Sequence, residues 1–528
     1  GRFRLVPNNG LHDIGLFPCT GFSFLDYDLD GKLDMYVTTF STDHRNNVWM
    51  PGILMKGNGD GTFVDASARS GIDQVAEPNY GATITDYNND GWPDILTCPY
   101  CRTNGTLWKN NGDGTFTDAT DETGYTAKNG MLGNVDPPAR ELCQWEALPA
   151  DYDNDGDMDV AQMLVHGGLG ATEGRSPLSI NGGPLTNYRL TWDINKFDRP
   201  LISQIRTWRD TLKSVSGADS AIITRRTPLG TGHLGDQAGS WLDWNNDMLQ
   251  DFIISTTGYD PAQDRAYMEH QNPDHTFTDI AKATGLSKWL RPTHSNRPFD
   301  FDLDGDDDIA VVFAPNVSQV PPADRVRANQ VLLVRNDIGN RSNHVTVKLK
   351  APPQVNRNAI GARIYVYAGG VRQMRDIQSG VGRWGMMQPF ELNFGLAQNT
   401  SIDSIVVRWP MTGNPLTTVV NPPINRVVEI DGTGMTTGVA ESTASAALSI
   451  ELSPNPTSDW MTARIASPLR ESSSLEIYNA MGERVHRTVL DGAEFVRVPV
   501  ENLPAGYYVV RIASIDGQAS TASFIKTH

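Results

Sequence analysis

The sequence predicts an all-β fold, a β-propeller of five to seven blades followed by two small β-sandwich domains. Three observations lead to this prediction. The chain of 528 residues has 49 glycines and 32 prolines between segments rich in valine, isoleucine and threonine, which is typical of short strands and tight turns. One acidic nine-residue pattern recurs through roughly the first 340 residues and is missing from the rest. A chain of this length also exceeds one ordinary core, so several domains are expected.

The acidic pattern occurs five times. The copies are "DYDLDGKLD" (26–34), "DYNNDGWPD" (86–94), "DYDNDGDMD" (151–159), "DWNNDMLQD" (243–251) and "DFDLDGDDD" (300–308). Apolar, alternating segments flank the copies. "NGDGTF" follows at 58–63 and 111–116, with "NPDHTF" at 272–277, and the Asn-Gly and Asp-Gly steps favour hairpin turns. Each repeat therefore predicts a four-stranded antiparallel unit, which is a propeller blade.

Two features of the repeats leave the number of blades open. The interval from Asp151 to Asp243 is the longest, and it predicts either an insertion at about 163–240 or a blade that has lost its motif. The fifth repeat lacks an outer strand. We expect "RFRLV" at 2–6 to supply that strand from the other end of the chain.

The spacing of oxygen-bearing side chains in the loops predicts calcium. Positions 1, 3, 5 and 9 are Asp or Asn in every copy, and position 6 is glycine in all but the fourth, which has Met248. Ca²⁺ takes six to eight oxygen ligands and uses this 1-3-5 spacing in EF-hand loops, whereas Mg²⁺ demands stricter geometry. Position 7 varies, as expected where only its backbone carbonyl serves. The alternative is a set of solvated acidic turns.

This interpretation gives about five structural Ca²⁺ ions. The predicted ligands are Asp26, Asp28, Asp30, Lys32 and Asp34; Asp86, Asn88, Asp90, Trp92 and Asp94; Asp151, Asp153, Asp155, Asp157 and Asp159; Asp243, Asn245, Asp247, Leu249 and Asp251; and Asp300, Asp302, Asp304, Asp306 and Asp308.

The loops, together with "NGDGTF", resemble the FG-GAP/VCBS family of propeller repeats over roughly residues 1–340. The resemblance implies a structural Ca²⁺ in a loop between two strands of each blade. The long third interval and the degenerate "NPDHTF" depart from the family pattern.

We expect residues 341–431 to form an independent β-sandwich. Segments such as "NHVTVKLK" and "SIDSIVVRWP" have the alternating pattern of strands, and turn residues lie between them. The segment resembles the ASPIC/UnbV domain that follows such repeats in cartilage-acidic-protein-like chains. The matching residues are Asn356-Arg357, Ile360-Gly361-Ala362-Arg363, Phe394-Gly395-Leu396 and Trp409-Pro410.

Residues 432–447 are small and polar, as in a flexible linker. Residues 448–528 then carry "SPNP", "YNAMGERV" and "LPAGYYVVRI", which resemble the type A C-terminal sorting domain of the type IX secretion system. That resemblance implies the type IX secretion machinery as a partner, and a secreted protein or one on the outer-membrane surface of a Bacteroidota-type bacterium. An ordinary immunoglobulin-like module is the alternative.

Charge and composition exclude some function classes. The net charge of −18 argues against a nucleic-acid partner, and no apolar run approaches the length of a membrane helix. The four cysteines, Cys19, Cys98, Cys101 and Cys143, fit two disulfides of unspecified pairing. "CPYC" at 98–101 has the redox-active spacing, but it follows a strand without a βαβ context, so a structural disulfide is the preferred interpretation.

The sequence assigns no catalytic residue, since neither HExxH nor GxSxG occurs. The glycine-rich "HGGLGATEG" (166–174) lacks the remainder of a phosphate-binding loop. The insertion, with His166, Trp192, Trp208 and His233, is the expected place for a ligand site. We therefore expect a secreted or surface-displayed, calcium-stabilised binding or adhesion protein with a glycan, protein or matrix ligand. The alternative is an extracellular polysaccharide-active enzyme at the propeller mouth.

Overall fold

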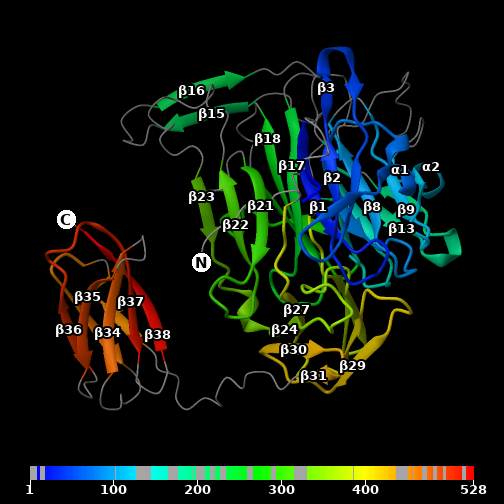
Figure 1. Ribbon diagram of the computed structural model, residues 1–528. Helices are drawn as coiled ribbons and strands as arrows, with labels where there is room; N and C mark the ends of the chain where they lie inside the picture. Colours follow the sequence, from blue (N-terminus) through cyan, green and yellow to red (C-terminus); the bar gives the residue numbers. More distant parts are fainter. Residues whose placement is uncertain are drawn as a thin grey trace. The chain divides into compact units, whose positions relative to one another are not determined.

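The computed structural model describes most of the chain, and it divides the chain into two compact units, Gly1–Gly438 and Val439–His528 (Figure 1). The described residues are 9–11, 18–100, 103–126, 144–164, 176–193, 196–197, 208–213, 220–225, 233–258, 266–286, 293–313, 330–383, 386–435, 450–455, 457–465, 473–479, 484–490, 495–513 and 519–527.

The first unit contains five antiparallel sheets whose strands follow one another in chain order. The first sheet has β1 (Cys19–Leu25), β2 (Asp34–Thr39), β5 (Ile53–Gly57) and β6 (Phe63–Asp65); the second has β7 (Asn79–Thr85), β8 (Asp94–Pro99), β9 (Leu107–Asn110) and β10 (Phe116–Asp118); the third has β11 (Gln144–Ala150), β12 (Asp159–Leu164), β13 (Leu178–Asn181) and β14 (Leu190–Asp193); the fourth has β17 (His233–Leu242), β18 (Asp251–Gly258), β19 (Ala266–Gln271) and β20 (Phe277–Asp279); and the fifth has β21 (Thr293–Phe299), β22 (Asp308–Phe313) and β23 (Gln330–Val334).

Short elements connect these strands. They are β3 (Ser41–Asp43), β4 (Val48–Trp49), η2 (His44–Asn46), α1 (Ser67–Ser70), η3 (Ile72–Gln74), α2 (Thr120–Thr123), η4 (Pro184–Thr186) and η8 (Gly339–Arg341). Helices α1 and α2 end at Gly71 and Gly124, which adopt the left-handed backbone that terminates helices.

A repeated side-chain hydrogen bond joins each sheet to the sheet before it. An amide from the end of a third strand donates to the backbone carbonyl of the second residue in the preceding acidic loop. The pairs are Asn110 Nδ2 with Tyr27 O (2.9 Å), Asn181 Nδ2 with Tyr87 O (3.0 Å), Gln271 Nε2 with Tyr152 O (2.9 Å) and Asn336 Nδ2 with Trp244 O (2.5 Å). The five sheets are therefore neighbours in chain order.

The long interval between the third and fourth acidic loops contains a separate two-stranded sheet. Strands β15 (Trp208–Lys213) and β16 (Ser220–Arg225) pair only with each other in the described part of the chain. The third and fourth sheets nevertheless contact directly, since Trp241 Nε1 donates to Leu148 O at 2.9 Å. The predicted bounds of 163–240 include β13 and β14, which belong to the third sheet, and the choice between an insertion and a blade that has lost its motif stays a prediction.

The described residues do not show a closed ring, so the number of blades stays a prediction. The expected closing strand at 2–6 lies outside them. Residues 9–11 lie against the outer strand of the first sheet, where Asn9 O accepts a hydrogen bond from Phe63 N at 2.8 Å.

Residues 343–435 form a sandwich of two four-stranded sheets. One sheet has the order β27 (Leu392–Ala397), β24 (Asn343–Leu349), β30 (Val427–Asp431) and β31 (Gly434–Met435); the other has β26 (Val371–Asp376), β25 (Arg363–Ala368), β28 (Ser404–Arg408) and β29 (Leu416–Val420). Alternate residues such as Val345, Val347, Ile364 and Val366 are buried in one shared apolar core, as period-two patterning requires.

This sandwich, called the second domain below, is not a separate body. It packs against the acidic-loop ends of the five sheets, with β24 and β27 beside those ends in Figure 1. A segment around Val381 also reaches the first strands, where Gly382 N donates to Thr83 Oγ1 at 2.7 Å and Arg383 bridges to Gly81. These contacts could not be predicted from the sequence, because they join residues about three hundred positions apart.

The second compact unit is also a β-sandwich. Its sheets are β32 (Ile450–Ser453), β33 (Trp460–Ile465) and β36 (Phe495–Pro499); and β35 (Arg484–Leu490), β34 (Ser473–Asn479), β37 (Gly506–Ala513) and β38 (Ala519–Lys526). Their inward residues, including Met461, Ile477, Val510 and Phe524, share one core. The linker proposed at 432–447 lies mostly outside the described residues.

The prediction of two disulfides does not hold in the structure. Cys19 and Cys98 are both free thiols, the first exposed and the second buried in an apolar cluster with Leu96 and Leu107. They lie on strands of different sheets, and Cys101 and Cys143 lie outside the described residues.

Candidate metal centre

The five acidic loops share one backbone conformation. Each connects the first and second strands of its sheet, and positions 4 and 6 have positive φ in every copy. Position 4 is Leu29 (53°), Asn89 (60°), Asn154 (60°), Asn246 (56°) and Leu303 (62°), and position 6 is Gly31 (84°), Gly91 (90°), Gly156 (96°), Met248 (81°) and Gly305 (94°). Glycine is therefore preferred at position 6, and the fourth loop keeps the geometry without it.

The carboxylates at positions 1 and 5 shape the turn. Asp26 accepts hydrogen bonds from the backbone N–H groups of Asp30 (3.0 Å) and Gly31 (2.9 Å), and Asp30 accepts one from Lys32 N at 3.0 Å. Corresponding bonds occur in the other loops. These bonds hold the carboxylates of positions 1 and 5 against the backbone of the turn.

Position 9 has a structural role that the sequence pattern did not reveal. Asp34 accepts from Tyr27 N (3.0 Å) and from Gly57 N on the third strand (2.8 Å). The same two bonds recur at Asp94, Asp159, Asp251 and Asp308. This aspartate thus ties its loop to the third strand, whether or not it also binds a cation.

Several carboxylate oxygens in the loops are buried without a hydrogen-bond partner. They are Asp28 Oδ1, Asp86 Oδ1, Asp151 Oδ2, Asp153 Oδ1 and Asp306 Oδ1. Three sets of carboxylates can each bring one oxygen per residue within 4.8 Å of the others, namely Asp26, Asp28 and Asp34; Asp151, Asp153 and Asp159; and Asp300, Asp302 and Asp304. Burying an unpaired carboxylate oxygen is costly, and a hard cation would satisfy these atoms. The residues present therefore fit Ca²⁺.

Burial also perturbs the acidity of these groups. It raises the pKa of Asp26 and of Asp151 to about 7 and that of Asp34 to about 8, with neighbouring aspartates adding to the shift. Burial holds the pKa of Asp94, Asp159 and Asp243 well above the usual range. Without a cation, the loops thus favour protonation.

The side chains at position 7 differ, as expected if only the carbonyl is common. Lys32 is exposed and Leu249 is partly buried. Trp92 lies over Gly112, where the indole leaves no room for a Cβ. Asp157 accepts from Asn89 Nδ2 at 2.8 Å, and Asp306 accepts from Asn340 N at 2.8 Å.

Sequence analysis missed the basic residues that contact the loops. Lys56 Nζ contacts Asp28 Oδ2 and lies 3.0 Å from Asp30 Oδ2. Arg408 of the second domain contacts Asp86 Oδ2, and the buried Arg363 donates to Asp86 O at 2.8 Å and to both oxygens of Asp376. No local pattern identifies these pairs, since each partner lies far away along the chain.

The second domain also touches position 6 of every loop. A Cβ at Gly31 would meet the Gln354 carbonyl, and at Gly156 it would meet the Arg372 guanidinium; Gly91 and Gly305 are similarly close to Asn414 and His344. Met248, the exception to glycine, is 6% exposed and belongs to the apolar core of the second domain. Position 6 thus has two roles: it allows the turn of the loop, and it contacts the second domain.

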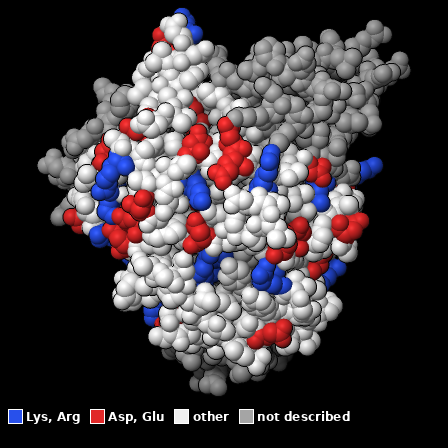
Figure 2. Space-filling model, turned by 90° about the vertical axis from the view of Figure 1, so that its right-hand side faces the viewer, with Lys and Arg blue, Asp and Glu red and all other residues white. Residues whose placement is uncertain are grey.

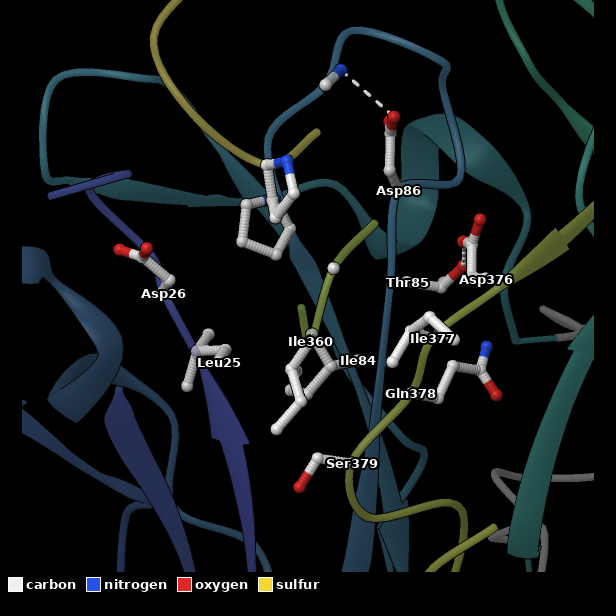
Figure 3. A pocket seen from close by; sticks show the side chains of 14 residues that line it. Leu25, Asp26, Ile84, Thr85, Asp86, Ile360, Asp376, Ile377, Gln378 and Ser379 are labelled. Atoms are coloured by element: carbon white, nitrogen blue, oxygen red, sulfur yellow. Dashed lines mark hydrogen bonds between the residues drawn. The ribbon is translucent and has the colours of Figure 1, made fainter. Parts of the chain in front are cut away.

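Little space remains between the loops and the second domain. A cavity of about 20 Å³ lies between Asp26 and Asp86 and is lined by Ile360, Ile377 and Ser379 of the second domain. Figure 3 shows these side chains around it. A second cavity, of about 90 Å³, lies near Trp241, Arg375 and Asp307. Both are too small for an organic ligand of ordinary size.

The surface shows no broad region of one charge on the face in Figure 2, where acidic and basic side chains are interspersed. Among the candidates in the insertion, Trp192 donates its Nε1–H to Gly124 O at 3.0 Å and packs within the third sheet. The side chains of Trp208 and His233, and all of His166, lie outside the described residues, as does the glycine-rich 166–174 segment.

Family models match three parts of the chain. The FG-GAP-like repeat matches residues 26–97 and 86–161, the model named ASPIC and UnbV matches 352–437, and the secretion system C-terminal sorting domain matches 451–527. The chain carries FG-GAP-like repeats, an ASPIC/UnbV domain and a C-terminal sorting domain. The ASPIC/UnbV match covers the second domain except β24, and the sorting-domain match covers most of the second compact unit.

The sorting domain indicates secretion by the type IX system of Bacteroidota. In the described part of the chain no helix is long and apolar enough to cross a membrane.

Curated relatives share short stretches with this chain. Cartilage acidic protein 1 of Xenopus tropicalis is 32% identical over 115 residues, which is 21% of this chain and 15% of the relative. Cartilage acidic protein 1 of Homo sapiens is 44% identical over 46 residues, or 9% and 7% of the two chains. The chain thus spans less than a sixth of the length of these relatives.

Solved structures give only weak matches. A Bacteroides vulgatus protein of the DUF3244 family with an immunoglobulin-like β-sandwich has 19% identity and a TM-score of 0.13, with 15% of this chain and 96% of that chain covered. A fungal alcohol oxidase of the AA5 family has 12% identity and a TM-score of 0.26, with 97% and 98% covered. Scores this low carry no argument about fold or function.

Proposed function

We propose that this protein is a secreted or surface-displayed β-propeller protein that Ca²⁺ stabilises and that binds an extracellular glycan. The observation that carries the calcium assignment is the set of buried carboxylate oxygens without partners, which includes Asp28 Oδ1, Asp86 Oδ1 and Asp151 Oδ2. Four four-stranded sheets and one described three-stranded sheet, each antiparallel in chain order and joined to the next by the same amide hydrogen bond, support the propeller.

The binding site is proposed at the end of the sheets opposite the acidic loops. The second domain covers the loop end, and the two cavities described there are small. At the other end, residues that follow β2 and β8 or begin β7 and β11 form an aromatic cluster, defined as Phe40, Tyr80, Tyr100 and Trp145. Phe40 and Tyr80 are stacked with ring centroids 5.4 Å apart, and Tyr80 lies 5.1 Å from Tyr100 and 5.4 Å from Trp145.

The aromatic cluster suits a sugar better than it suits a simple core. All four side chains are partly exposed, whereas core aromatics in this chain such as Tyr36 and Phe252 are fully buried. Arg383 lies beneath the cluster, 4.5 Å from the centre of the Trp145 ring. Flat apolar ring faces beside polar groups are the combination that binds the amphipathic faces of sugars.

The test is a glycan array probed with the calcium-loaded full-length chain, in wild-type form and as Tyr80→Ala and Tyr100→Ala variants. Trp460→Ala is the matched control, since Trp460 is a 40% exposed aromatic residue in the other compact unit. We expect binding to a restricted glycan class, lost in both cluster variants and kept in the control. A wild-type protein that binds no glycan, or whose binding survives both substitutions, contradicts the proposed site.

The enzyme alternative is tested on the same panel. Release of reducing ends from a bound polysaccharide indicates catalysis, and binding without release indicates a binding protein.

A further inference from the structure

In each sheet, one residue at the end of the third strand donates its backbone N–H to the aspartate at position 9 of the acidic loop. The residue just before this donor in the chain lies beside the loop in every sheet. That bond is donated by the N–H groups of Gly57, Asn110, Asn181, Gln271 and Asn336. One position earlier stand Lys56, Lys109, Ile180, His270 and Arg335. Four sheets therefore place a basic side chain at this position, and the third sheet places an isoleucine there.

The basic side chains act on the predicted metal ligands. Lys56 Nζ contacts Asp28 Oδ2 and Asp30 Oδ2 in the first loop. His270 Nδ1 lies 2.9 Å from Asp251 Oδ1, and Arg335 Nη1 lies 3.9 Å from Asp302 Oδ2. The charge of Lys109 acts on Asp90. Lys56, Arg335 and, when protonated, His270 thus each pair with a carboxylate of their loop without a metal ion, whereas Lys109 forms no ion pair with the second loop among the described residues.

The third loop is different. It contains five aspartates, and among the described residues no cationic group lies within ion-pairing distance of their carboxylates. Arg372 reaches this loop from the second domain and donates to the backbone carbonyl of Asp155 at 2.6 Å; its charge also acts on Asp151 and Asp157, but among the described residues it pairs with neither carboxylate. Asp151 is 1% exposed, and its Oδ2 and the Oδ1 of Asp153 are buried without a hydrogen-bond partner.

We propose that the third-strand basic residue is a built-in counterion that Ca²⁺ displaces, and that the third loop, which lacks one, is the tightest calcium site. The inference rests on the proposed calcium binding. Ca²⁺ and Lys56 compete for the carboxylates of Asp28 and Asp30 in the first loop, so calcium binding there opposes an ion pair. Calcium binding to the third loop breaks no such pair, and it neutralises five aspartates that have no third-strand counterion.

The experiment is calorimetric Ca²⁺ titration of the chelator-treated full-length protein. Wild type is compared with Lys56→Met, Lys56→Gln and Ile180→Lys. Lys348→Met is the control, since Lys348 pairs with Glu391 at 3.0 Å on the surface of the second domain and the change in net charge is the same. Asp153→Asn and Asp28→Asn identify which class of sites belongs to which loop.

We expect Ile180→Lys to weaken the tightest class by about tenfold, which corresponds to one displaced ion pair. Lys56→Met and Lys56→Gln should strengthen a weaker class by a similar factor, and Asp153→Asn should remove the tightest class. Both Lys56 variants should also melt at a lower temperature in chelator, because their first loop has lost its counterion.

Two results separate the role of the counterion from calcium binding itself. If wild type binds Ca²⁺ but both Lys56 variants keep the wild-type affinities, the counterion inference is overturned while calcium binding stands. If wild type binds no Ca²⁺ at all, the proposed function fails, and the inference fails with it. Loss of the tightest class in Asp28→Asn rather than in Asp153→Asn would also overturn the assignment to the third loop.

Discussion

Asn399 Nδ2 donates to the sulfur of Met248 at 3.2 Å, which joins the second domain to the one acidic loop that lacks glycine at position 6. In the neighbouring loops the second domain touches a bare glycine. In the fourth loop it receives a methionine side chain into its apolar core, although that residue has a φ of 81°. Met248, which replaces the glycine of the other loops, thus links the fourth sheet to the second domain.

Met248→Gly should therefore destabilise the protein, although it restores the pattern of the other loops. Removing a buried methionine side chain costs about 2–5 kcal/mol, and relief of the left-handed backbone returns about 1 kcal/mol. We expect a net loss of about 1–4 kcal/mol in denaturant unfolding of the first unit. Leu303→Ala is the control, because Leu303 is 83% exposed, and it should change stability by less than about 0.5 kcal/mol.

Removal of calcium should destabilise the five sheets and the second domain together. The second domain packs against the acidic loops, so loss of ions from the loops should also weaken its packing. At a hundredfold excess over the dissociation constant, each site contributes about 2.7 kcal/mol. We expect EDTA to lower the melting temperature of the first unit by more than about 5 °C and to leave the sorting domain unchanged. Scanning calorimetry with and without EDTA checks this, and an unchanged first transition contradicts the metal sites.

The buried pair between Arg363 and Asp376 should be essential to the interface. Arg363 is fully buried and also donates to the carbonyl of Asp86, so Arg363→Met leaves Asp376 and that loop without their donor. Breaking one side of a buried ion pair costs about 3–5 kcal/mol. Arg484→Met, which removes a half-exposed partner of Glu476, should cost less than about 1 kcal/mol. Equal losses of unfolding free energy in the two variants would argue against a buried interface.

Without calcium, stability should fall as the pH rises. Burial raises the pKa of Asp26 and Asp151 to about 7 and of Asp34 to about 8, from an ordinary value of 3.8. The folded state holds these protons more tightly than the unfolded chain, so the destabilisation grows between about pH 4 and pH 8. We expect the melting temperature in EDTA to be higher at pH 5 than at pH 8, and the stabilisation by added Ca²⁺ to grow over the same window. A flat profile in EDTA contradicts the burial of unpaired carboxylates.

Thiol titration should separate Cys19 from Cys98. Cys19 is exposed, whereas burial holds the pKa of the Cys98 thiol well above its usual range. An excess of thiol reagent should modify Cys19 in the native protein and Cys98 only after denaturation. A titration that finds neither thiol in denatured protein would restore the disulfide hypothesis.

The acidic loops could be predicted from the sequence because all their defining residues lie within nine positions. The alternation of Asp26, Asp28 and Asp30 before Gly31 specifies a tight turn with inward carboxylates, and the strands on either side follow from period-two patterning. The same local logic predicted the strands of both sandwiches.

The tertiary structure alone decided what lies next to those loops. Lys56 meets Asp28 across a sheet, Arg408 meets Asp86 from another domain, and Met248 enters a core built mainly from residues beyond 340. No local spacing encodes such pairs, because they arise when surfaces distant along the chain pack together and bury charge that must then be compensated. A local acidic turn therefore predicts where a cation can bind, and the residues packed around it determine the free energy of binding.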